Sequence, residues 1–125
     1  MTHAREIYTQ TRLVAAFLLD EVTRRTNNNF LFLPASITTE ELDDAVKKSL
    51  EHLDSELNIE EFYTEVLPLV AAKDAVIIAL REKAEIFRNT SPIKEFLIDN
   101  FLDGYLKTVN EALWERIDTV KPLLG

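Results

Sequence analysis

The side chains that could carry chemistry in this sequence are few, and their spacing favours no catalytic site. Nucleophilic catalysis needs a Ser or Cys beside a base, and the chain holds four Ser, no Cys and two His. Helical bundles build metal sites from Glu-x-x-His pairs, but the residue three positions before His52 is Ser49. His52 and Glu56 are one helical turn apart, yet Lys48 lies one turn before His52 and favours a cluster of exposed charges. We therefore expect no catalytic residue, no metal site and no cofactor.

Acid–base catalysis by paired carboxylates would require burial that separates their pKa values. Asp74 follows Lys73 inside the most apolar stretch of the chain and is the best candidate for a buried charge. A structural ion pair is the favoured interpretation of Asp74.

Composition and charge narrow the classes of function further. The chain has 125 residues, 46% of them hydrophobic, which suits one compact domain over residues 1–125. Two glycines are too few for a phosphate-binding loop. The formal charge of −8 argues against binding to nucleic acid or to an anionic membrane surface. No apolar run is long enough to span a bilayer and the first residues do not resemble a secretory signal, so we expect a cytoplasmic protein.

Apolar residues recur every three or four positions through most of the chain, which is the period of an α-helix. The pattern predicts helices over residues 4–27, 39–57, 59–88 and 93–120, with a kink or break at Pro68 in the third. In the last helix, Gly104 either bends the helix or lets a neighbouring helix approach closely. The prediction is an all-α, antiparallel bundle of four main helices, or five if Pro68 divides the third.

Local sequence signals set the expected helix ends. Thr38 and Glu41 have the spacing of a capping box, and Asn58 with Glu61 repeats it. Ser91 before Pro92 is typical of an N-cap followed by the first helical residue. Lys121 and Pro122 are expected to end the last helix.

The segment Phe30-Leu31-Phe32-Leu33-Pro34 does not follow the helical period. Four consecutive large apolar residues fit no amphipathic helix, and the proline favours an extended residue before it. The preferred interpretation is a connector whose side chains plug one end of the bundle. A patch that binds a partner or a second copy is the first alternative, and an edge strand is the second.

Residues 39–65 hold ten acids and two lysines, a net charge of −8 that equals the charge of the whole chain. Such a segment can steer a basic partner by raising its association rate. The alternative is a solvated surface helix whose acids cap helix ends and maintain solubility. The acids of the expected face are Asp43, Asp44, Glu51 and Asp54.

The last helix carries four aromatic residues, Phe96, Phe101, Tyr105 and Trp114. Aromatic residues at helical spacing are expected in the core. Trp114 lies off the apolar line, so it is also a candidate for an interface contact.

These observations favour a non-catalytic module that acts through protein contacts, as an adaptor, a regulator or a self-associating subunit. The expected partner is a protein, with a basic one favoured by the acidic face, or a second copy in a dimer. The alternative hypothesis is a bundle that binds a small apolar ligand in a cavity between Pro68 and the last helix. The expected partner-binding residues are Asp43, Asp44, Glu51, Asp54, Phe30, Phe32 and Trp114.

Overall fold

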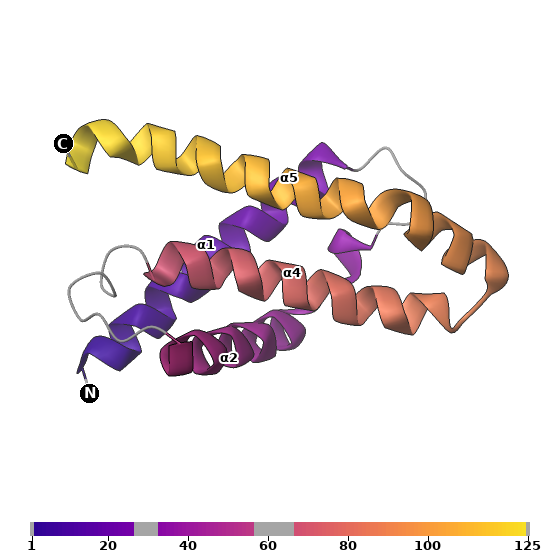
Figure 1. Cartoon of the computed structure of the whole chain (residues 1–125), viewed down its shortest axis with the longest axis horizontal. Helices are drawn as coiled ribbons and strands as arrows, with labels where there is room; N and C mark the ends of the chain where they lie inside the picture. Colours follow the sequence, from indigo (N-terminus) through magenta and orange to yellow (C-terminus); the bar gives the residue numbers. More distant parts are fainter. Residues whose placement is uncertain (1, 27–32, 57–66, 125) are drawn as a thin grey trace.

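A computed structural model describes the backbone of residues 2–26, 33–56 and 67–124 and the side chains of residues 5–26, 33–52 and 67–117. Within these ranges the protein is all-α, as predicted, with four long helices that pack against one another. The elements are α1 (Thr2–Arg25), the short 3-10 helix η1 (Pro34–Ser36), α2 (Thr39–Glu56), α4 (Leu67–Arg88) and α5 (Pro92–Leu124) (Figure 1).

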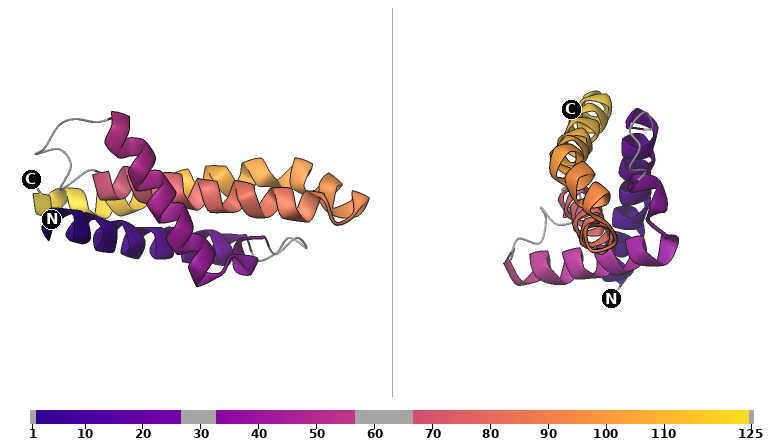
Figure 2. Two further views of the ribbon diagram at one scale, coloured as in Figure 1. Left: turned by 90° about the horizontal axis from the view of Figure 1, so that it is seen from below. Right: turned by 90° about the vertical axis from the view of Figure 1, so that its right-hand side faces the viewer.

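Helix α4 lies at the centre of the bundle and packs against α1, α2 and α5. α1 and α4 run in one direction, and α2 and α5 run in the opposite direction (Figure 1). A view from below shows that α2 crosses the other helices obliquely (Figure 2). The prediction that the most apolar stretch of the sequence forms the central element is therefore confirmed.

Small side chains explain how α4 can contact three helices. An alanine side chain takes up little space between two packed helices, so neighbouring backbones can approach closely on several sides. One contact is also polar: the Ser49 hydroxyl on α2 is fully buried and donates a hydrogen bond of 2.8 Å to the carbonyl oxygen of Ala71. The buried alanines of α4 are Ala71, Ala72, Ala75, Ala79 and Ala84.

The predicted helix starts are confirmed where the structure describes them. The Glu41 N–H donates to the Thr38 hydroxyl at 3.1 Å, and the Thr38 N–H donates to the Glu41 carboxylate at 2.8 Å. These reciprocal bonds are the predicted capping box. The Lys94 N–H donates to the Ser91 hydroxyl at 3.2 Å, and α5 begins at Pro92.

Pro68 is the second residue of α4, so it lies in the first helical turn, where a missing N–H costs no helical hydrogen bond. From there α4 continues to Arg88. The predicted cap formed by Asn58 and Glu61 lies outside the described residues, as does the helix start predicted at residue 59.

Helix α5 is longer than the sequence predicts, because it continues through Pro122 to Leu124. Pro122 removes a single backbone donor close to the C-terminal end, which is not enough to end a helix of this length. The helix also does not break at Gly104. A Cβ atom at Gly104 would meet nothing within 4 Å, so the expectation that a neighbouring helix approaches this residue is wrong.

The space around Gly104 gives a test of the helical assignment. Gly104→Ala should raise the free energy of unfolding by about 0.5–1 kcal/mol, because alanine loses less conformational freedom in a helix than glycine. Urea unfolding followed by circular dichroism measures the change. Ala16→Gly on the exposed side of α1 is the matched control and should lower the same quantity by about 1 kcal/mol. A destabilising Gly104→Ala would contradict a regular helix at this position.

Candidate functional site

The four acids of the predicted face have different environments in the structure. The Arg12 Nε atom of α1 donates to Asp43, so this carboxylate joins α1 to α2. Asp44 and Glu51 lie exposed on α2. The side chain of Asp54 lies outside the described residues.

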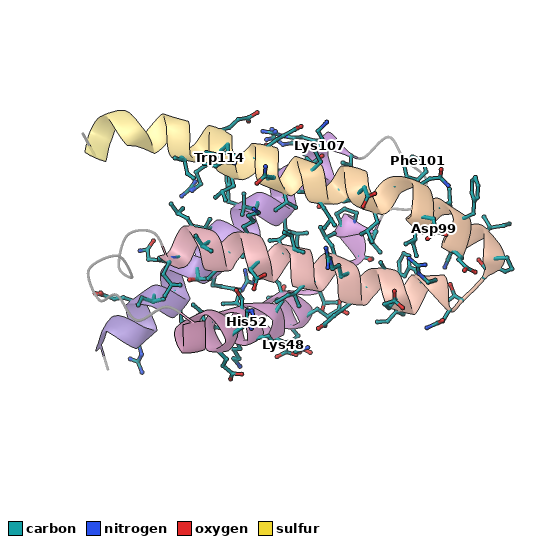
Figure 3. The ribbon with its side chains drawn as sticks, in the orientation of Figure 1. Lys48, His52, Asp99, Phe101, Lys107 and Trp114 are labelled. Carbon is teal, nitrogen blue, oxygen red and sulfur yellow. The ribbon has the colours of Figure 1, made fainter. Side chains whose placement is uncertain are left out.

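Two further ion pairs join α2 to the central helix. The Lys83 ammonium of α4 lies 3.1 Å from the Glu41 carboxylate. The Lys48 ammonium on α2 lies 2.7 Å from the Glu82 carboxylate of α4 (Figure 3). The cations Arg12 and Lys83 on neighbouring helices thus offset two of the negative charges of α2, whereas Glu82 offsets one of its positive charges.

The electrostatic effect is clearest at the start of α2. The Thr38 N–H lowers the pKa of Glu41 most strongly, and Lys83 lowers it further. The Glu82 carboxylate raises the pKa of Lys48. Both shifts stabilise the charged forms, so these residues contribute to folding as well as to surface charge.

The capping carboxylate predicts a pH dependence. Glu41 has a folded-state pKa below its ordinary 4.5, so its stabilisation is present above pH 4.5 and is lost as the pH falls through the folded value. Glu41→Gln should therefore lower the free energy of unfolding at pH 7 by less than about 1 kcal/mol, because the side chain is partly exposed. The deficit should narrow as the pH falls below 4.5.

Urea unfolding at several pH values measures this effect. Glu51→Gln, on the exposed side of the same helix, is the control and should follow the wild-type curve. An equal deficit for Glu41→Gln at pH 7 and pH 3 would contradict a contribution from the charge.

The apolar connector is described only at its last two residues. Leu33 is fully buried and belongs to the hydrophobic core, in agreement with the prediction of a plug. Its backbone is helical, with φ −59° and ψ −50°, because η1 begins directly after it, so the extended geometry expected before Pro34 is wrong. Pro34 is buried as well, and the Ser36 hydroxyl donates to the Leu33 carbonyl at 2.6 Å. Phe30 and Phe32 lie outside the described residues.

The aromatic residues of α5 do not share one environment. Tyr105 is buried and Phe101 is half-buried, as predicted. Phe96 is 66% exposed, so its assignment to the core is wrong. Trp114 is 57% exposed and lies on α5 away from the α4–α5 turn (Figure 3). Ile98, two positions after Phe96, is fully buried, so the face of α5 that packs against the core at this level does not include Phe96.

Two further exposed apolar residues lie near Phe96 in the sequence, at the end of the bundle where α4 is followed by α5, and sequence reasoning missed them. The α4–α5 hairpin extends beyond the ends of α1 and α2 (Figures 1 and 2). Ile86 in the last turns of α4 is 55% exposed, and Ile93 in the first turn of α5 is 73% exposed. We call Ile86, Ile93 and Phe96 the hairpin tip.

The buried carboxylate predicted at Asp74 has a different environment from the one expected. Its Oδ2 atom is buried without a hydrogen-bond partner, and Asp74 forms no ion pair within the described part of the chain. The described residues thus supply no partner for the predicted structural ion pair. The half-buried position leaves room for the carboxylate to avoid a full desolvation cost.

A buried ion pair occurs instead on α1. Glu21 is 7% exposed and pairs with Arg24 and, at 3.0 Å, with Arg25. Arg25 also contacts Glu115 of α5 through two nitrogen atoms. Glu115 raises the pKa of Arg25, and Arg25 lowers the pKa of Glu115. This cluster joins the C-terminal part of α1 to α5.

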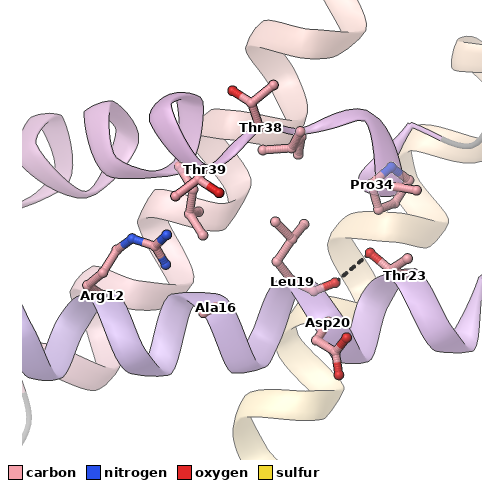
Figure 4. A pocket seen from close by; sticks show the side chains of 11 residues that line it. Arg12, Ala16, Leu19, Asp20, Thr23, Pro34, Thr38 and Thr39 are labelled. Carbon is pink, nitrogen blue, oxygen red and sulfur yellow. Dashed lines mark hydrogen bonds between the residues drawn. The ribbon is translucent and has the colours of Figure 1, made fainter.

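A pocket of about 360 Å³ lies between α1, η1 and the start of α2 (Figure 4). Its walls include Leu19 of α1, Pro34 of η1 and Leu42 of α2. Arg12 and Thr39 add polar groups at one side. The pocket is on a different side of the bundle from the cavity that we expected between Pro68 and the last helix.

Comparison with protein-family models, curated proteins and solved structures finds no match. Among the described residues, no group of three His, Asp or Glu side chains is placed to hold a metal ion. None of the described helices is long and apolar enough to cross a membrane. The interpretation of function therefore depends on the surfaces and the pocket described above.

Proposed function

We propose that the protein is a non-catalytic protein–protein interaction module whose partner docks on the hairpin tip. The observation that carries this proposal is the exposure of three large apolar side chains within eleven positions, each more than half exposed. Clustered exposed apolar side chains are typical of interaction sites. An exposed aromatic ring such as Phe96 is a common centre of binding energy.

The charged residues near the hairpin tip support an apolar mode of contact. The Arg88 guanidinium at the end of α4 lies 3.0 Å from the Asp99 carboxylate of α5. The Lys94 ammonium lies 5.0 Å from the centre of the Phe87 ring. These cations are engaged within the hairpin, so binding at the tip would depend mainly on its apolar side chains.

The exposed acids of α2 favour a basic partner. Asp44 and Glu51 lie on the surface, and the chain carries a net charge of −8. Negative charge repels a second copy and attracts a basic protein at long range. A dimer formed through the hairpin tip is the other outcome that the experiment below can show.

Site-specific crosslinking tests the proposal. A photoreactive amino acid at position 95, between Ile93 and Phe96, should give one discrete adduct in cells of the native organism. The double substitution Ile86→Ser and Phe96→Ser should reduce that adduct about tenfold, since it removes most of the apolar contact. Mass spectrometry identifies the partner, and an adduct of twice the chain mass identifies a dimer.

Two controls separate docking from folding and from random collision. The same photoreactive residue at Gln10, exposed on α1, should give no such adduct. Leu13→Ser removes another exposed apolar side chain and should leave the position-95 adduct unchanged. An adduct that is equally strong with the double substitution would contradict docking at the tip.

The steering role of α2 gives a separate kinetic prediction. Asp44→Asn with Glu51→Gln should lower the association rate of the crosslinked partner several-fold at low salt and leave its dissociation rate nearly unchanged. The difference should disappear at high ionic strength, because salt screens exposed charges. Surface plasmon resonance measures both rates, and equal association rates at low salt would contradict steering.

A further inference from the structure

The pocket between α1, η1 and α2 combines one cationic group with apolar walls. Figure 4 shows the Arg12 side chain extending from α1 toward Thr39 on the pocket side of the helix. Leu19, Ile37 and Leu42 supply apolar wall. A volume of about 360 Å³ lies within the range of small-ligand sites.

Arg12 keeps donors for a second acceptor. A guanidinium group has five N–H donors in a planar fork. The Nε donor is bonded to the Asp43 carboxylate, and the other four have no partner among the residues that the structure describes. The edge formed by terminal N–H groups matches the two oxygen atoms of a carboxylate.

The acids near the pocket lower its affinity for an anion, but they leave the terminal N–H groups of Arg12 available. Asp20 of α1 is part of the pocket lining (Figure 4), and its carboxylate disfavours a bound anion. Glu41 is engaged by Lys83 and by the Thr38 N–H. Asp43 competes directly for the guanidinium and offsets its charge. A ligand anion must therefore gain much of its binding energy from the apolar walls.

From this arrangement we infer that the pocket binds a small carboxylic acid with a short branched apolar group. The carboxylate pairs with the terminal nitrogens of Arg12, and the apolar group lies against Leu19, Ile37 and Leu42. A neutral amide of the same shape lacks the negative charge that pairs with Arg12. The site does not depend on the proposed docking at the hairpin tip.

Titration of the whole protein with isovalerate, followed by amide NMR spectra, tests this inference. The shifts of residues in the pocket, among them Ala16, Leu19 and Leu42, should saturate at millimolar concentrations. Arg12→Gln should weaken binding at least tenfold, and Arg12→Lys at least threefold, because lysine keeps the charge but not the fork. Arg81→Gln, at an exposed arginine of α4, is the matched control and should leave the affinity unchanged.

The competing carboxylate provides the sharpest outcome. Asp43→Asn should tighten isovalerate binding several-fold, because it frees the Nε donor and removes a neighbouring negative charge. Isovaleramide should produce no saturable shifts. The NMR spectrum of each variant shows directly whether its fold is kept. Arg12→Lys and Asp43→Asn are separate single variants that test the inference independently. Equal binding of the amide, or an affinity unchanged by both Arg12→Lys and Asp43→Asn, would overturn the inference.

Discussion

The close packing of α4 against three other helices is the constraint on which the rest of the structure depends. Ala71, Ala75 and Ala79 are buried and leave space for neighbouring backbones. A larger side chain at these positions would push α1, α2 or α5 away, because the protein interior is packed as densely as an organic crystal and has no room for extra methylene groups. The buried hydrogen bond from the Ser49 hydroxyl to the Ala71 carbonyl oxygen also requires that α2 and α4 lie close together.

The same constraint explains why α2 needs its ion pairs. Its buried apolar stripe is narrow: in the described part of α2 the buried apolar residues are Leu42, Ala45 and Val46. Polar contacts at the edges of the helix add to this apolar contact with α4. Asp43 and Glu41 supply these contacts on opposite neighbours, α1 and α4 respectively. Much of the acidity near the start of α2 is thus used to hold the helix in place.

Local features of the fold could be predicted from the sequence, because their physical causes lie within a few residues. The capping box of Thr38 and Glu41 and the start of α5 at Pro92 depend only on adjacent backbone donors. The environment of Phe96 could not be predicted in the same way. Ile98, two positions after Phe96, is fully buried, and Tyr105 lies two helical turns after Ile98 on the same face of α5. Phe96 lies on the opposite face, which none of the described helices covers.

Charge shows the same difference between composition and structure. The sequence places a charge of −8 in residues 39–65, but it contains no signal that Arg12, thirty-one positions before Asp43, faces that carboxylate. An ion pair of this kind neutralises an acid of α2 and places a cation of another helix beside it. Arg12 is part of the lining of a pocket and pairs there with Asp43. An acidic helix can in this way place a guanidinium group beside apolar walls, at a position that its own composition does not predict.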